Sequence, residues 1–313
     1  MSQHNQEIAA TNTPILAARE VVKQYGSTKV LDRITMDVPR GSIYGLLGPN
    51  GAGKTTFIRI ANQITAPDSG EILFMGRRLQ RDDIAQIGYL PEERGLYRKM
   101  KVGEQALYLA RLKGLSKADA WQRISYWFDR FEIGSWWNKK VEELSKGMQQ
   151  KVQFIITVLH EPSLLILDEP FSGFDPINAE LLKSEIKRLR DNGATIILST
   201  HNMASVEEMC DHISLINKAQ CILQGNVAQI RQEYKSGEYE LGFSGNETAL
   251  TEALNTHGCT VSNSGLSGRI KIHAPETSSN QLLELAIACV TVHSFNEILP
   301  SMNDIFIRTV TQK

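Results

Sequence analysis

The chain has 313 residues, of which 42% are hydrophobic and 22% are charged, a composition typical of a globular protein with one large or two modest domains. Its 34 basic and 35 acidic residues give a formal net charge of −1, which excludes a global attraction to nucleic acid or anionic lipid, although a local patch can be hidden in such an average. The four cysteines are far apart and form no CxxC pair, which predicts buried thiols in a reducing compartment without disulfides or metal ligation.

The N-terminal residues lack the basic start and the apolar core of a signal peptide, and no apolar run approaches the ~18 residues of a membrane span. We therefore expect a soluble, cytoplasmic chain. If it acts at a membrane, another protein must supply the membrane-spanning segments.

The first half of the chain alternates between strand and helix patterns. Residues 1–13 are polar and predicted to be loose, and short β-rich pieces over residues 15–38 predict an antiparallel β layer. A buried strand over residues 41–48 runs into a glycine loop, a helix follows from Lys54, and residues from about 100 to 160 are predicted to form a mostly helical subdomain.

All four tryptophans fall between Trp121 and Trp137. They predict either a stacking platform for bases or sugars, or the core of the helical subdomain. The second interpretation is favoured because aromatic side chains usually fill cores.

Two continuous apolar runs, LLILD at residues 164–168 and ATIILS at residues 194–199, are typical of parallel strands that are buried on both faces. The segments ISLIN and CILQG, on either side of Lys218 and Ala219, predict a hairpin.

After about Tyr234 the pattern changes to strand, helix, strand, strand, helix, strand and a last helix. This order predicts a small α+β ferredoxin-like domain over residues 235–313. The segment has 5 basic and 8 acidic residues, so it is a poor nucleic-acid binder by charge.

The sequence GPNGAGKT, residues 48–55, fits the phosphate-binding pattern GxxxxGK[ST], with a strand before it and a helix after it. Glycines let backbone N–H groups curl round phosphates, and the helix N-terminus adds positive potential. We expect Lys54 to reach the β and γ phosphates of a nucleotide and Thr55 to ligate Mg²⁺.

A pair of acids ends the buried strand in LLILDEP, residues 164–170. Asp168 is predicted to hold the Mg²⁺ shell, and Glu169 to act as general base on a water that attacks the γ-phosphate. Two acids at this place would be costly as mere structure, because unpaired charge resists burial.

With LSKGMQQK at residues 144–151 between these two motifs, and with Asp175 and His201 after them, the chain resembles the nucleotide-binding subunit of an ABC (ATP-binding cassette) transporter. The resemblance covers about residues 15–234. It implies a P-loop NTPase cassette over residues 14–234, with a mixed sheet core, an antiparallel β layer and the helical subdomain.

The resemblance assigns roles residue by residue. Tyr25 matches the adenine-stacking aromatic, Ser145 and Gly147 the signature that contacts the γ-phosphate held by the opposite protomer, Asp175 the D-loop, and His201 the switch histidine that senses the γ-phosphate. Catalysis is then expected from Glu169, His201 and Lys54. The phosphate-loop positions are Gly48, Asn50, Gly51, Ala52, Gly53, Lys54, Thr55 and Thr56.

Two positions depart from the family pattern. In LSKGM, Lys146 replaces a glycine and Met148 a glutamine of the usual LSGGQ. In YLPEERGLY, Glu92 falls where the family has the Q-loop glutamine. A glutamate keeps an oxygen ligand for a hard cation but loses the amide donor, so we expect Glu92 to contact the bound nucleotide and ligate its Mg²⁺; the alternative is a solvated acid in a subunit-facing loop.

The stretch YLPEERGLYRKM together with the C-terminal domain resembles a bacterial subgroup whose ATPase subunits carry an added C-terminal domain and work with exporters of the sodium-extrusion or multidrug type. The resemblance implies ATP hydrolysis with Mg²⁺, a head-to-tail homodimer that closes two ATP sites, a separate membrane-spanning permease subunit, no nucleic-acid partner, and a peripheral location on the inner face of the cell membrane.

Two other functions stay open. One is an ABC ATPase that acts on ribosomes or DNA, although such proteins usually carry two cassettes or long coiled coils. The other is a regulatory subunit that senses ATP without turnover, which Glu92 keeps open although Lys54, Asp168, Glu169 and His201 are all present.

Overall fold

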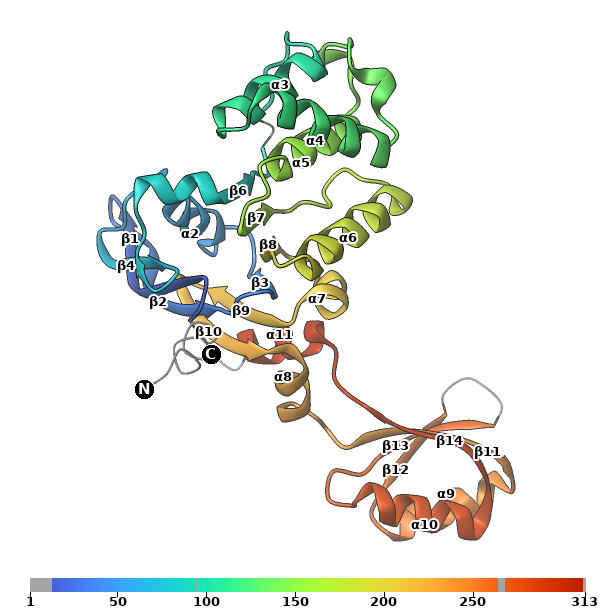
Figure 1. Ribbon diagram of the computed structural model, residues 1–313. Helices are drawn as coiled ribbons and strands as arrows, with labels where there is room; N and C mark the ends of the chain where they lie inside the picture. Colours follow the sequence, from blue (N-terminus) through green and yellow to red (C-terminus); the bar gives the residue numbers. More distant parts are fainter. Residues whose placement is uncertain (1–12, 94, 264–267, 312–313) are drawn as a thin grey trace, which may run out of the picture. The chain divides into compact units, whose positions relative to one another are not determined.

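The computed structural model describes residues 13–93, 95–263 and 268–311 (Figure 1). The chain divides into two compact units, the first ending at Asn226 and the second beginning at Val227, and each is described by itself. The loose N-terminus predicted for residues 1–13 lies outside the described residues, apart from Thr13. Among the helices that the structure describes, none has the length and apolar character needed to span a bilayer.

The first unit contains an antiparallel β layer, as predicted from the β-rich pieces after residue 15. Its strands lie in the order β2-β1-β4-β5, and Leu16 pairs with Val38 on one side and with Phe74 on the other. The strands are β1 (Leu16–Tyr25), β2 (Thr28–Val38), β4 (Ser69–Phe74) and β5 (Arg77–Arg78).

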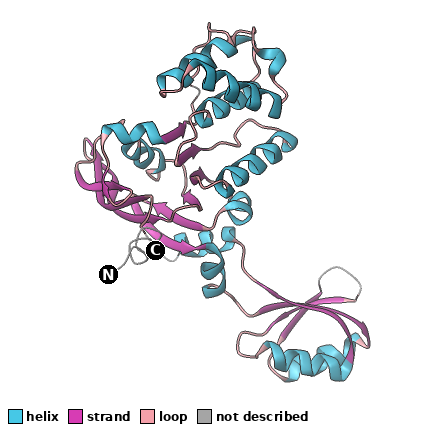
Figure 2. Ribbon diagram, in the orientation of Figure 1, coloured by secondary structure: helices cyan, strands magenta, loops and turns pink. Residues whose placement is uncertain are grey.

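A six-stranded sheet forms the centre of this unit, in the order β10-β9-β3-β8-β7-β6 (Figure 2). The three strands that carry the apolar runs of the sequence, β3, β7 and β8, are buried along their whole length and pair in parallel. Strands β9 and β10 form the predicted hairpin. The strands are β3 (Ile43–Leu47), β6 (Ile87–Leu90), β7 (Leu164–Asp168), β8 (Thr195–Thr200), β9 (His212–Asn217) and β10 (Gln220–Asn226).

The helices that follow the parallel strands begin at clear caps. Helix α2 (Lys54–Ala61) follows β3 through the glycine loop, α6 (Pro176–Asp191) begins at Asp175, and α7 (Met203–Met209) begins at Asn202. At the last two caps the side chain accepts a hydrogen bond from a backbone N–H of the first turn, which satisfies a donor that the helix leaves free. A 3-10 helix η1 (Arg81–Gln86) precedes β6.

The helical subdomain contains α3 (Val102–Leu112), α4 (Lys117–Arg130) and α5 (Lys146–Val158), with two short 3-10 helices η2 (Gly134–Trp136) and η3 (Val141–Glu143) (Figure 1). Trp127 is buried and its ring lies 5.9 Å and 6.0 Å from those of Phe131 and Phe154. Trp121 stays about half exposed and stacks on Trp137 with ring centroids 4.4 Å apart. The favoured core interpretation therefore holds for Trp127, whereas Trp121 lies at the surface.

The second unit has the predicted ferredoxin-like plan. Its antiparallel sheet has the order β12-β13-β11-β14, which is the strand order that a split βαβ arrangement produces, and α9 and α10 pack against it (Figure 1). The elements are α8 (Val227–Glu233), β11 (Glu238–Gly245), α9 (Glu247–Thr256), β12 (Thr260–Asn263), β13 (Arg269–His273), α10 (Ser279–Cys289), β14 (Val290–Ile298) and α11 (Met302–Thr311).

Helix α8 is grouped with this second unit, although it precedes Tyr234, where the sequence pattern changes. Hydrogen bonds explain the grouping: Arg231 Nε donates to the Pro300 carbonyl at 3.0 Å, and the hydroxyls of Tyr234 and Thr309 lie 3.4 Å apart. The residues before and after the ferredoxin-like sheet are thus held to each other.

Candidate functional site

The phosphate loop joins β3 to α2, and its glycines are required by its path. Gly48, Gly51 and Gly53 have φ angles of +146°, +80° and +114°, a region that favours glycine. A Cβ atom on Gly48 or on Gly53 would collide with the backbone carbonyl of a neighbouring segment. The loop therefore needs glycine for its conformation and also for the space that it has.

Lys54, the first residue of α2, folds back over this loop. Its Nζ donates to the carbonyl oxygens of Gly48 at 2.7 Å and Pro49 at 3.2 Å. Burial lowers the pKa of Lys54, and the negative charges of Glu169 and Asp168 oppose that shift. The ammonium group is thus held at the loop by carbonyl oxygens and by nearby acids, and it forms no ion pair within the described residues.

Thr55 and Asp168 meet although they are far apart in the sequence. The Thr55 hydroxyl donates to Asp168 Oδ2 at 3.3 Å. Asp168 is almost fully buried at the end of β7, and burial raises the pKa of its carboxyl group, with the charge of Glu169 acting in the same direction. A hydroxyl and a buried carboxylate side by side are a suitable pair of oxygen ligands for Mg²⁺.

Glu169 has the most constrained backbone of the site, with φ +48°. Its N–H donates to the Ser199 carbonyl at 2.9 Å. Its Oε1 accepts from the His201 N–H at 3.0 Å and lies 2.6 Å from His201 Nδ1, while Oε2 accepts from the Thr200 hydroxyl at 3.3 Å. The end of β8 therefore fixes both oxygens of this carboxylate.

A cavity of about 380 Å³ joins these groups. It brings together the predicted aromatic Tyr25, the predicted loop acid Glu92 and the two acids at the end of β7. Tyr25 and Glu92 are both exposed, so a ligand can reach them. The lining residues are Tyr25, Val30, Asn50, Gly51, Gly53, Lys54, Thr55, Thr56, Glu92, Asp168 and Glu169. Gly48 and Ala52 belong to the same loop, with Ala52 buried beneath it.

The predicted residue His201 does not line this cavity itself but contacts Glu169, which does. The predicted residues Ser145, Gly147 and Asp175 also lie outside the lining. Ser145 caps α5 and accepts from the Met148 N–H at 3.3 Å, and Asp175 caps α6 and accepts from the Asn178 N–H at 3.0 Å. A Cβ atom on Gly147 would lie 3.4 Å from the Gly173 carbonyl oxygen, so the start of α5 lies against the loop that leads to Asp175. These residues form a second group, apart from the cavity.

Two buried glutamines of α5, which are not among the residues predicted from the sequence, contact loops of the site. Gln153 Nε2 lies 3.5 Å from the Pro91 carbonyl, next to Glu92, and Gln150 Nε2 lies 3.5 Å from the Pro170 carbonyl, next to Glu169. Thr200 was also missed. The two glutamines could have been predicted from polar residues at positions where the helix pattern predicts burial. Thr200 could have been predicted from its place next to His201 in the STH sequence.

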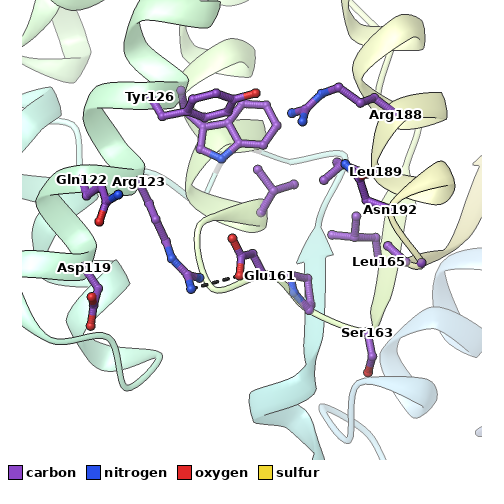
Figure 3. A pocket seen from close by; sticks show the side chains of 15 residues that line it. Asp119, Gln122, Arg123, Tyr126, Glu161, Ser163, Leu165, Arg188, Leu189 and Asn192 are labelled. Carbon is purple, nitrogen blue, oxygen red and sulfur yellow. Dashed lines mark ion pairs between the residues drawn. The ribbon is translucent and has the colours of Figure 1, made fainter.

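A second cavity, of about 770 Å³, is larger but differs in its chemistry (Figure 3). It lies between α4, the turn before β7 and the end of α6, and its lining includes Trp127 and Leu165. Both of its arginines are already paired with carboxylates: Arg123 lies 2.9 Å from Glu161, and Arg188 lies 2.8 Å from Glu185. Arg188 also lies over the Tyr126 and Trp127 rings. Size alone therefore does not identify the functional site.

Among the residues that the structure describes, no group of three or more His, Cys, Asp or Glu side chains is placed to hold a metal ion. Proteins usually hold Mg²⁺ with one or two carboxylates while substrate phosphates and water complete the shell. The pair of Thr55 and Asp168 beside the phosphate loop fits that kind of site.

Comparison with known families gives two matches. Residues 31–172 match the family described as ABC transporter, and residues 225–310 match the family described as ATP-binding protein DrrA1-3-like, C-terminal domain. The two matches cover the cassette core and the second unit.

Individual proteins agree with these matches. The chain is 40% identical to the uncharacterized ABC transporter ATP-binding protein YhaQ of Bacillus subtilis, over 95% of this chain and 98% of that protein. It is 35% identical to the Nod factor export ATP-binding protein I of Cupriavidus metallidurans, over 68% of this chain and 71% of that protein. The solved structure of an ATP binding subunit of an ABC transporter is 32% identical, with a TM-score of 0.66, and the similarity covers 70% of this chain and 93% of that one.

Proposed function

Because this chain belongs to the ATP-binding proteins of ABC transporters, we propose that it is the ATP-hydrolysing motor of an exporter and drives a separate membrane-spanning permease. The direction of transport is supported by the similarity to a Nod factor export protein. The proposal extends to an exporter of the sodium-extrusion or multidrug type, with the chain on the inner face of the cell membrane. The second unit matches the C-terminal domain of DrrA1-3-like ATP-binding proteins, which supports membership of a subgroup with an added C-terminal domain.

The catalytic role of the site depends on Glu169. Its carboxylate accepts the proton of the attacking water, and His201, 2.6 Å away at Nδ1, orients it and contacts the γ-phosphate. Lys54 leaves the carbonyls of Gly48 and Pro49 to bind the β and γ phosphates, and Tyr25 stacks on adenine.

Thr55 and Asp168 are the proposed Mg²⁺ ligands, supported by their contact at 3.3 Å. The bound ion would neutralise phosphate charge as the γ-phosphoryl group leaves. Glu92 lines the same cavity as Thr55 and Asp168, which supports its role as a third oxygen ligand in place of the usual glutamine.

One observation supports the head-to-tail dimer in this proposal. Ser145 and Gly147 do not line the cavity that Lys54 and Glu169 line. A chain that carries two half-sites apart from each other completes both when two copies meet head to tail about a two-fold axis. In that arrangement the hydroxyl of Ser145 and the N-terminus of α5 face the γ-phosphate held by the partner, where the helix dipole favours negative charge.

The test is affinity purification of the Glu169→Gln chain with ATP from native membranes, followed by mass spectrometry of the proteins that copurify. We expect a multi-span membrane protein in stoichiometric amount, since slow hydrolysis holds the dimer closed. Recovery of ribosomes or of soluble partners alone, across several detergents, would contradict the transporter role. Phosphate release by the wild-type complex, compared with Glu169→Gln, separates a motor from a subunit that senses ATP without turnover.

A further inference from the structure

The helical subdomain is much more basic than the chain as a whole. Residues 95–159 carry 12 basic and 6 acidic side chains, a formal charge of +6 in a chain whose net charge is −1. The near-zero net charge of the chain therefore hides an uneven distribution, and the helical subdomain has a positive net charge that attracts anions. The basic residues are Arg98, Lys99, Lys101, Arg111, Lys113, Lys117, Arg123, Arg130, Lys139, Lys140, Lys146 and Lys151.

Five of these cations come together because two segments run side by side. The Val102 N–H donates to the Lys139 carbonyl, and the Val141 N–H donates to the Met100 carbonyl, both at 3.0 Å. The Glu142 N–H donates to the Arg98 carbonyl at the same distance. This pairing forms what we call the basic strip, composed of Arg98, Lys99, Lys101, Lys139 and Lys140, all of them exposed.

The arrangement of the basic strip is unfavourable for stability. Lys101 and Lys140 stand directly opposite each other in an antiparallel bridge, and like charges in that position repel. Within the described residues, Lys101 lies 3.8 Å from Glu104, and no ion pair involves the other four cations. A repulsive pair at an exposed position is more readily explained by binding to an anionic surface than by folding.

Three acids lie near the strip and offset part of its charge. Glu104 is the loosely placed partner of Lys101, and Glu143 uses its carboxylate to accept the Lys140 N–H at 2.8 Å. Glu142 is exposed and follows the strip in sequence. Five exposed cations with three acids near them leave a net charge of +2 along the strip.

Exposed aromatic rings flank the strip. Tyr97 precedes Arg98 and is 52% exposed, and Trp121 is 45% exposed. Trp121 stacks on Trp137, whose carbonyl accepts the Gly103 N–H at 3.1 Å beside the strip. Tyrosine and tryptophan next to lysine and arginine are typical of surfaces that lie at the headgroup level of a bilayer.

We propose that the basic strip binds the headgroups of an anionic bilayer directly, with Tyr97 and Trp121 at the level of the headgroups. Each lysine or arginine near such a surface adds about 1 kcal/mol of attraction at moderate salt. Single-stranded nucleic acid also favours cations with rings, but there the rings must be open to bases, whereas Trp121 has one face covered by Trp137. Binding to lipid headgroups needs neither the permease nor ATP turnover, so this proposal goes beyond the proposed function. If lipid binding is not observed, the proposed ATPase function is unaffected.

The test is sedimentation of the full chain with vesicles of phosphatidylcholine that contain 30% phosphatidylglycerol, and with vesicles of phosphatidylcholine alone. The test variant is Lys99→Gln/Lys139→Gln/Lys140→Gln. The matched control, Arg78→Gln/Arg81→Gln/Lys218→Gln, removes the same charge from exposed positions outside the helical subdomain. Thermal melting of each variant checks that the fold is kept.

We expect the wild type and the control to bind anionic vesicles, with binding that falls as salt rises, and neither to bind phosphatidylcholine alone. The test variant should bind about fivefold more weakly for each lysine removed, or on the order of a hundredfold in total. Equal loss in the control, equal binding to neutral vesicles, or no binding of the wild type would overturn the proposal. Binding of an oligonucleotide in place of vesicles would overturn it as well and assign the strip to nucleic acid.

Discussion

Two cavities of the first unit, the one beside α4 and the one at the phosphate loop, differ in how their charged side chains are paired. In the larger one, beside α4, Arg123 and Arg188 already have carboxylate partners, and Arg188 also lies over aromatic rings. In the smaller one, Lys54 is held by backbone carbonyls, and Asp168 is buried beside the Thr55 hydroxyl, with no cation paired to it within the described residues. Charged groups that are buried and incompletely satisfied indicate a ligand better than volume does, because such an arrangement is costly until the ligand is bound.

The largest expected effect is on turnover, in the smaller cavity. Glu169→Gln removes the proposed base but keeps its size, so the rate of phosphate release should fall about a thousandfold, or about 4 kcal/mol in the barrier. ATP affinity should be retained, because the loop and Lys54 are unchanged. The matched control is Glu132→Gln, an exposed acid of the helical subdomain. A rate within threefold of wild type would remove Glu169 from the catalytic role.

Trp127→Ala tests whether the residues around the larger cavity stabilise the fold or bind a ligand. The ring is 6% exposed and packs on Phe131 and Phe154, so its loss should lower the free energy of unfolding by about 3 kcal/mol. Tyr126→Ala, on the same helix but 49% exposed, should cost less than about 1 kcal/mol. Denaturant titration measures both changes. If the Trp127 variant is as stable as the wild type but binds ATP more weakly, the larger cavity is part of the nucleotide site.

His160, in the turn between α5 and β7, predicts a pH dependence in the same region. Burial, with the charge of Lys113 acting in the same direction, lowers the pKa of this imidazole to about 4. Because the folded pKa lies below the ordinary value of about 6.5, the stabilisation is present above pH ~6.5 and is lost as the pH falls towards 4, by up to about 3 kcal/mol. His160→Gln should flatten this acid limb of the stability curve, whereas His257→Gln, in the second unit, should not. An unchanged acid limb in His160→Gln would show that other groups cause it.

The smallest expected effect is at Glu92, in the smaller cavity. Glu92→Gln removes one negative charge near the proposed Mg²⁺ ligands, so ATP should bind severalfold more tightly without Mg²⁺, and the dependence on Mg²⁺ should weaken. Titration of ATP with and without the metal ion measures this, with Glu93→Gln as the neighbouring control. If neither quantity changes, Glu92 is a solvated acid and the Q-loop role is wrong.

Much of the fold could be predicted because the relevant signals are local. The continuous apolar runs of β7 and β8 indicated buried parallel strands, and the element order of the second unit indicated its split βαβ plan. The glycines at 48, 51 and 53 indicated a tight loop, and the structure places each at a positive φ. The roles of Gln150 and Gln153 could not be read from spacing, because their contacts are with loops far away in the sequence.

The sequence by itself determined the order of the motifs, the strand and helix periods and the identity of the charged groups, because these depend on residue type and short spacing. The tertiary structure decided which of those groups meet. It placed Thr55 against Asp168 and His201 against Glu169, and it left Ser145 outside the cavity that Thr55, Asp168 and Glu169 line. It also set Lys101 opposite Lys140 within a chain of nearly zero net charge. Such contacts depend on how strands and helices are ordered in space, and no local pattern encodes that order.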